Sequence, residues 1–268
     1  MDVRLGVSSM FGHKSENLRY EAGMIVLRFI VNVAILAFEI ALVAAAAWLG
    51  LHHPLTFAAL TAGLTLAFGL VLEHARLRHE LPFYFGKGFS GHALFARLMA
   101  FIDAIVKALL AGLMALITFS GTDPERLFWV AIFFGVSIFA GSSLLRRLSI
   151  SLNAQPSRWG YFRLAAPLGL LFSFALSFLP TKSFADIGMT IVFDLPAKPS
   201  ISQASEVLFV LKQKFDAMIV LALSGFMSPE AAQLAGTLVS VNVLSGFVIA
   251  IYAVLIAEAV RWLEDASP

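Results

Sequence analysis

The sequence contains no cysteine and few charged residues for its length. Among its 268 residues, 13% are Asp, Glu, Lys or Arg, and 59% belong to the hydrophobic class. The absence of Cys excludes disulfides and thiolate metal sites, and a soluble domain would carry about 25% charged residues. The net charge is only +2, so we expect no nucleic acid among the partners of this chain.

Motifs that hold phosphates, metals or catalytic nucleophiles are also missing. The sequence has no Walker-type Gly-rich loop, no His-Glu-x-x-His spacing and no Gly-x-Ser-x-Gly nucleophile elbow. Each of these motifs places specific side chains around a reacting group, so their absence argues against the corresponding chemistry. We therefore predict that the protein is not an enzyme and that it uses no metal or cofactor.

Long apolar stretches are the dominant feature that is present. Each is continuous for roughly 20 residues, as a membrane-spanning helix requires, whereas spanning strands would alternate over about ten residues. We expect an all-α integral membrane bundle of six transmembrane helices and one shorter, re-entrant helix. The predicted spans are 24–49, 55–72, 98–119, 127–145, 164–179 and 232–262.

Lys and Arg residues in the predicted loops indicate the orientation. The side of a membrane that carries most basic residues in short loops is usually cytoplasmic. Three basic segments, 1–23, 73–97 and 146–163, share one side if the chain crosses six times. We therefore predict cytoplasmic N and C termini, in a bacterial inner membrane.

The pattern also predicts a domain organisation. We expect a cytoplasmic segment 1–23, a four-helix bundle 24–148, a two-helix pore-like domain 159–262 that includes a re-entrant segment 205–228, and a tail 263–268.

The shorter apolar segment, 207–223, precedes the last span and has charges within it. Lys212, Lys214 and Asp216 would each cost a few kcal/mol near the centre of a bilayer. A re-entrant loop, or an amphipathic helix on the membrane surface, avoids most of that cost. After this segment a Ser-Gly break precedes Ser228 and Pro229, which form a typical helix start. Two interpretations stay open, a pore loop and an interfacial helix followed by an ordinary helix start.

The order of helix, short helix, Gly-aromatic turn, Ser-Pro and final helix covers 164–262. It resembles the pore domain of tetrameric cation channels of the potassium-channel superfamily. The resemblance implies a homotetramer that conducts monovalent cations through a constriction formed by one turn of each copy. The implied constriction residues are Ala222, Leu223, Ser224, Gly225 and Phe226. Met227 stands near the place of the second filter Gly of that family, so we expect poor or unusual selectivity.

One face of the last predicted span would line such a conduit. At helical spacing this face carries Asn242, Ser245, Ile249, Tyr252 and Ile256. In the channel interpretation Ile249 and Ile256 close the pore by dewetting. The alternative is that the small and hydroxyl-bearing residues of this span join neighbouring membrane helices.

Four charged residues fall inside predicted spans. Arg28 and Glu39 share one face of the first span, and Asp103 and Lys107 lie one turn apart in the third. From their depths we predict two ion pairs, Arg28 with Asp103 and Glu39 with Lys107. These pairs are either a proton or cation relay or contacts that fix helix packing.

Three functions follow from these patterns. The first is a homo-oligomeric, tetrameric cation channel in a lipid bilayer. The second is a proton- or cation-coupled transporter that uses Glu39, Asp103 and Lys107 within one protomer. The third is a scaffold subunit of a larger membrane complex.

Overall fold

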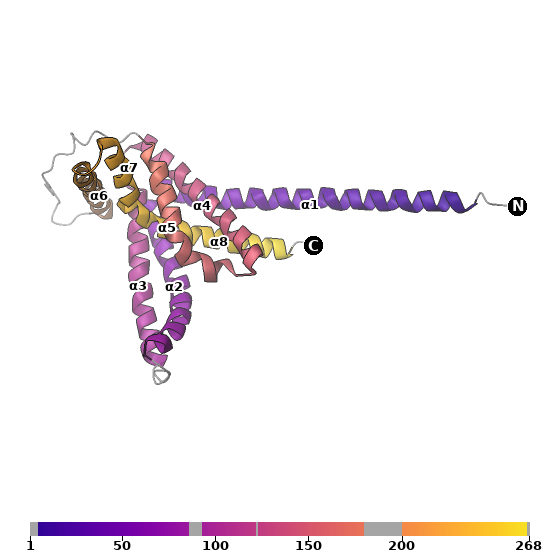
Figure 1. The fold of residues 1–268 in the computed structure, drawn as a ribbon, viewed down its shortest axis with the longest axis horizontal. Coiled ribbons are helices and arrows are strands. Elements are labelled where there is room, and N and C mark those ends of the chain that lie inside the picture. Colours follow the sequence, from indigo (N-terminus) through magenta and orange to yellow (C-terminus); the bar gives the residue numbers. More distant parts are fainter. Residues whose placement is uncertain (1–4, 86–92, 122, 180–199, 267–268) are drawn as a thin grey trace.

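The computed structural model describes residues 5–85, 93–121, 123–179 and 200–266, and these form helices without any strand (Figure 1). The helices are α1 (Leu5–His52), α2 (Pro54–Phe85), α3 (Ala93–Thr118), α4 (Pro124–Leu152), α5 (Pro156–Ser177), α6 (Ile201–Ser224), α7 (Pro229–Val239) and α8 (Ser245–Ala266), with a short 3-10 helix η3 (Val241–Leu244) between the last two. The prediction of an all-α fold is confirmed for the described residues.

Five stretches are long and apolar enough to cross a membrane, which indicates an integral membrane protein. They are Val26–His52, Pro54–Leu77, Arg97–Thr118, Pro124–Leu152 and Pro229–Ala266. The predicted fifth span lies in α5, whose apolar part, Arg163–Ser177, is shorter than the other five. The count of six spans with one re-entrant helix therefore stays a prediction.

Local sequence explains where several helices begin. Asp123 precedes α4, and its Oδ1 accepts hydrogen bonds from the backbone N of Glu125 at 3.1 Å and of Arg126 at 3.4 Å. Ser200 and Gln203 form a capping box at the start of α6. At α7, Ser228 accepts a hydrogen bond from the third residue of the helix and is followed by a proline, as its sequence predicts.

The central element of the fold is α8, which packs against α1, α2, α3, α4 and α5. Its residues Val248, Ile249, Ile251 and Val260 are almost completely buried. A helical stretch that is apolar on all sides belongs in a core, and residues 246–257 of α8 fit that description. An aromatic contact joins α8 to α2, because the ring of Phe57 in α2 stacks on the ring of Tyr252 in α8 with 5.2 Å between their centroids.

Two glycines allow α5 and α8 to approach backbone to backbone. A Cβ atom on Gly246 would lie 2.6 Å from the N and Cα atoms of Gly169 and would overlap the carbonyl oxygen of Ala165. A Cβ atom on Gly169 would overlap the carbonyl oxygen of Val243. Small residues at such crossings let membrane helices pack closely, so this contact depends on the absence of side chains.

The predicted pore-lining face of the last span is instead part of this core. Ile249, Tyr252 and Ile256 are at most 6% exposed and contact helices of the same chain. The Tyr252 hydroxyl lies 3.0 Å from Thr61 Oγ1, and Ser245 Oγ lies 2.8 Å from Thr118 Oγ1. The prediction that these residues line a conduit was wrong, because helical spacing identifies a face without identifying what covers it.

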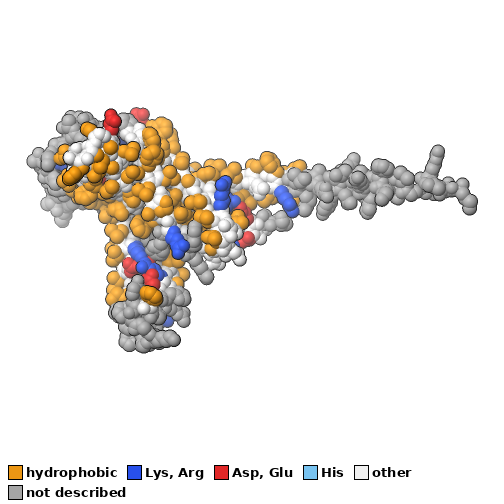
Figure 2. Space-filling model, in the orientation of Figure 1, with side chains coloured by type: hydrophobic (Ala, Val, Ile, Leu, Met, Phe, Trp, Pro, Cys, Tyr) orange, Lys and Arg blue, Asp and Glu red, His pale blue; other side chains and the backbone are white. Residues whose placement is uncertain are grey.

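The same packing joins the two predicted domains. Because α8 contacts helices on both sides of the proposed boundary between 148 and 159, no packing boundary separates a four-helix bundle from a two-helix domain. Figure 1 shows α6 and α7 together at the end of the molecule opposite both termini. Figure 2 shows hydrophobic side chains over most of the described surface in that view, with charged side chains gathered in a few groups.

Candidate functional site

The helix α6 covers two of its charged side chains and exposes several large apolar ones. Its residue Lys212 is 8% exposed and Asp216 is 21% exposed, whereas Phe215, Met218 and Leu221 are 49%, 53% and 64% exposed. An amphipathic helix on a soluble protein has the opposite arrangement. The exposed face of α6 therefore suits lipid, and its covered face suits a polar interior.

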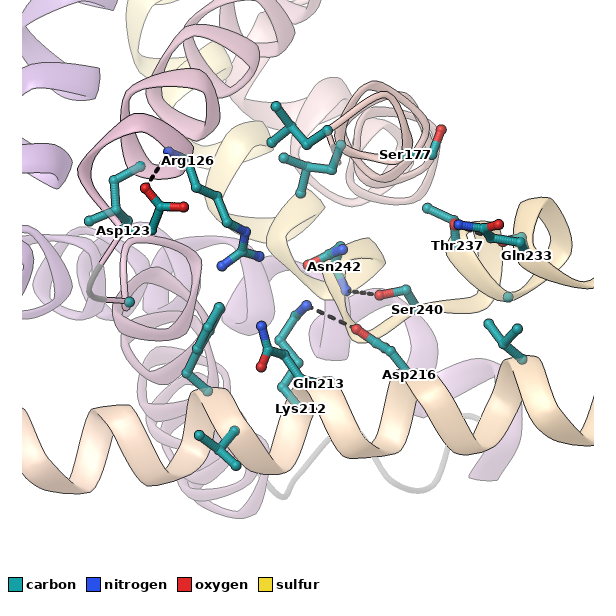
Figure 3. Close-up of a pocket in the computed structure, with 18 of the residues that line it drawn as sticks. Asp123, Arg126, Ser177, Lys212, Gln213, Asp216, Gln233, Thr237, Ser240 and Asn242 are labelled. Atoms are coloured by element: carbon teal, nitrogen blue, oxygen red, sulfur yellow. Dashed lines mark hydrogen bonds and ion pairs between the residues drawn. The ribbon is translucent and has the colours of Figure 1, made fainter. Parts of the chain in front are cut away.

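A cavity of about 310 Å³ lies against the covered face of α6. Its walls come from the start of α4, the end of α5, α6, α7 and the break before α8 (Figure 3). Since a water molecule occupies about 30 Å³ of liquid, this volume suits roughly ten waters or one small organic solute. Polar groups on the walls include Arg126, Lys212, Gln213, Asp216, Ser240 and Asn242.

The long apolar stretch of the last predicted span is interrupted in the wall of this cavity. Pro229–Ala266 contains 38 residues, about 57 Å as a straight helix, compared with a hydrocarbon core of about 30 Å. The structure divides it at Ser240, which has φ −50° and ψ 152°. Irregular backbone at membrane depth occurs where it is buried in protein or lines water, and here Ser240 borders the cavity.

Asp216 connects α6 to the break at Ser240 through hydrogen bonds. Its Oδ2 accepts a hydrogen bond from Lys212 Nζ at 3.0 Å, and its Oδ1 accepts one from the backbone N of Val241 at 3.2 Å. Ser240 Oγ accepts from the backbone N of Asn242 at 3.2 Å. These two side chains satisfy backbone N–H groups that the interruption leaves without helical partners. Each carboxylate oxygen of Asp216 therefore accepts a hydrogen bond.

Arg126 enters the cavity from the first turn of α4. Its guanidinium carbon lies 4.6 Å from the centroid of the Phe209 ring, which comes from α6. The nearby carboxylate of Asp123 uses Oδ1 to cap the helix. The guanidinium is thus held by an aromatic face and keeps its planar set of donors directed into the cavity.

The polar ends of four side chains converge in this space. Figure 3 shows the guanidinium of Arg126, the ammonium of Lys212 and the amides of Gln213 and Asn242 pointing toward one another from three different segments. Burial lowers the pKa of the Lys212 ammonium, and the carboxylate of Asp216 opposes this shift by favouring the charged form. The arrangement offers several hydrogen-bond donors to a bound molecule.

The predicted constriction residues lie outside the cavity, in the last turn of α6 and the turn that follows it. They are Ala222, Leu223, Ser224, Gly225 and Phe226. The Leu223 carbonyl accepts hydrogen bonds from the backbone N of Phe226 at 2.9 Å and of Met227 at 3.1 Å. Phe226 is 90% exposed. Assembly of several copies around this turn stays a prediction.

Asn242 is the one residue of the predicted pore-lining set that borders the cavity. Its backbone lies in η3, immediately after the break. A polar amide within an apolar span indicated a functional position, and the structure gives that amide a polar space to face.

Glu39 is completely buried and has partners other than the predicted one. Ser142 Oγ donates to its Oε1 at 2.7 Å, and Arg146 Nη1 donates to its Oε2 at 2.8 Å. Arg146 also pairs with Glu264 of α8. The predicted pairing of Glu39 with Lys107 was wrong, because α1 packs on α4 and α8 at this depth.

Lys107 of α3 instead pairs with Glu73 of α2 and with Asp103, whose Oδ2 lies 2.7 Å from its Nζ. Arg28 is exposed, and Asp103 takes its ion pair from Lys107, so the predicted pairing of Arg28 with Asp103 was also wrong. Depth along a helix can be judged from sequence, whereas the choice of neighbouring helix cannot. Glu73 was missed because it lies one residue beyond its predicted span, in the segment predicted as a basic loop.

These two charge clusters join helices and do not border the cavity. Among the residues that the structure describes, no group of three or more His, Asp or Glu side chains could hold a metal ion. No protein-family model, curated protein or solved structure matches the chain.

Proposed function

We propose that the chain is a membrane transport protein that carries a small polar solute through the cavity beside α6, within one protomer. The observation that carries this proposal is the reversed polarity of this part of α6, which covers Lys212 and Asp216 while Phe215, Met218 and Leu221 are exposed. Burying the charges of Lys212 and Asp216 between α6 and the rest of the protein is costly in an apolar interior. Their position therefore indicates that the protein interior beside α6 is polar.

The interrupted span supports the same proposal. Many transporters bind their solutes beside discontinuous membrane helices, whose unwound backbone supplies polar groups near the middle of the bilayer. Here the break at Ser240 borders the cavity and is fixed by Asp216 from α6. A contact of this kind can change with the occupancy of the cavity, because the carboxylate and the backbone N–H group both face polar space.

A homotetrameric cation channel is the second candidate, favoured by the exposed apolar turn between α6 and α7. Phe226 at this turn is 90% exposed, and copies of the turn around a central axis would cover it. A channel of this kind needs four copies, whereas the proposed carrier acts as one protomer.

We also propose that both termini are cytoplasmic, which would place the cavity toward the outer face.

Gln213→Cys should react with a charged, membrane-impermeant thiol reagent applied to either face of the membrane. A transport cycle exposes the solute cavity to both sides in turn, and Gln213 points into the cavity (Figure 3). The measurement is the labelled fraction in right-side-out and inside-out vesicles. This labelling experiment can be done without identifying the solute. The native chain has no cysteine, so no other thiol competes for the reagent.

Ser151→Cys is the matched control, because Ser151 is exposed near the end of α4 and outside the cavity. It should react from one face only. Reaction of Gln213→Cys from a single face, at the level of this control, would contradict transport and leave a one-sided binding site.

A further inference from the structure

We propose that the cavity binds its solute through a carboxylate or another oxyanion group, held by Arg126 and Lys212. This inference names the solute class of the proposed transport function, although binding can be measured without transport.

The Arg126 guanidinium has no hydrogen-bond acceptor among the described residues. Among the described residues, no hydrogen bond or ion pair joins its side chain to a carboxylate, and its contact is the Phe209 ring. Asp123 and Asp216 are near enough to attract it, but their hydrogen bonds go to other donors, namely backbone N–H groups and the Lys212 ammonium. A half-buried guanidinium with unused donors favours an anionic partner.

The two cations, Arg126 and Lys212, lie where each has an unfavourable electrostatic contact. Arg126 lies in the first turn of α4, where the helix dipole disfavours a positive charge. It also lies close enough to Lys212 for the two charges to repel each other. Both costs fall when an anion occupies the space between them, so the arrangement is better suited to an occupied cavity than to an empty one.

The hydrogen-bond donors of Arg126 and Lys212 have a shape that suits an oxyanion. A guanidinium binds carboxylate and phosphate oxygens through two parallel hydrogen bonds, and an ammonium adds a point charge beside them. The amides of Gln213 and Asn242 supply further polar contacts for the rest of the solute. The remaining carboxylate on the wall, Glu206, is exposed, so water screens its repulsion of an anion.

Succinate and inorganic phosphate are the probes for this proposal, with choline and glycerol as cationic and neutral comparisons. Binding is measured on the purified full chain in detergent, by the shift in unfolding temperature and by equilibrium dialysis at constant ionic strength. We expect at least one of the two anions to bind and to stabilise the protein. Arg126→Gln should weaken that binding about tenfold or more, since a charge-assisted hydrogen bond contributes more than a neutral one.

Arg147→Gln is the matched control, because it removes the same charge from an exposed position outside the cavity, and its anion affinity should equal that of the unmodified chain. Arg126→Lys keeps the charge without the planar donors, and we expect an intermediate affinity. This variant also keeps the proposal testable if Arg126→Gln fails to fold. A preference for succinate over phosphate would identify the oxyanion as a carboxylate.

Binding of neither anion, stabilisation by choline instead, or unchanged anion affinity in both Arg126 variants would overturn the proposal. The transport function is judged separately by the two-sided labelling of Gln213→Cys. Anion binding together with one-sided labelling would support the anion site and contradict transport. Two-sided labelling without anion binding would support transport and contradict the anion site.

Discussion

Gly246→Ala is expected to lower the free energy of unfolding by about 3 kcal/mol or more. The new methyl group would overlap the Ala165 carbonyl oxygen and lie 2.6 Å from the backbone N of Gly169. Neither neighbour is the flexible end of a side chain, so α5 and α8 have to move apart. Because α8 is the central helix of the core, this separation loosens contacts along its length. The change is measured as a lower unfolding midpoint in detergent.

Gly63→Ala is the control for this substitution. A Cβ atom on Gly63 would meet nothing within 4 Å, and alanine is a better helix former than glycine by up to about 1 kcal/mol. We expect a neutral or slightly stabilising effect. Equal unfolding midpoints for the two alanine variants would contradict the close crossing of α5 and α8.

Arg146→Met should produce the second large effect, a loss of about 3–5 kcal/mol. Arg146 pairs with Glu39, which is completely buried, and with Glu264 of α8. Its removal leaves the Glu39 carboxylate with Ser142 as its remaining hydrogen-bond partner. An uncompensated charge in this interior is costly, so the unfolding temperature should fall by roughly 10 °C.

Two further variants separate this explanation from a general effect of losing arginine. The double variant Glu39→Gln with Arg146→Met removes both charges and should recover a substantial part of the lost stability. Arg147→Met removes the adjacent, exposed arginine and should change stability by less than about 1 kcal/mol. If the double variant is as unstable as Arg146→Met alone, the buried charge is not the cause.

The sequence allowed the membrane class and the helical fold to be predicted, because continuous apolar stretches have one stable solution in lipid. It also located the helix start at Ser228 and Pro229, since capping depends on neighbouring residues. The partner of Glu39 could not be predicted in this way. Depth along the predicted spans pointed to Lys107, whereas Arg146 was assigned to a basic segment outside the fourth span, and only the packing of α1 on α4 brings Arg146 to Glu39.

The cavity was harder to predict, because its walls come from segments that are distant in sequence. Lys212 and Asp216 were noted as charges to be kept out of lipid, and the structure covers both of them beside the polar space. Arg126 was assigned to a loop, since it precedes the predicted fourth span by one residue. The sequence does not show that α4 and α6 border the same polar cavity, and Arg126 belongs to that cavity because of this packing.

The orientation of α6 is the central claim, and collision accessibility of spin labels along this helix tests it most directly. Single cysteines at Leu211, Phe215 and Met218, on the exposed face, and at Phe209, Gln213 and Val220, on the cavity side, would each carry a nitroxide in lipid vesicles. We predict maximal collision with oxygen, which concentrates in lipid, at the first three positions. A water-soluble nickel complex should instead reach Gln213 best. Nickel maxima at Phe215 and Met218 would place the apolar face in water and contradict the account.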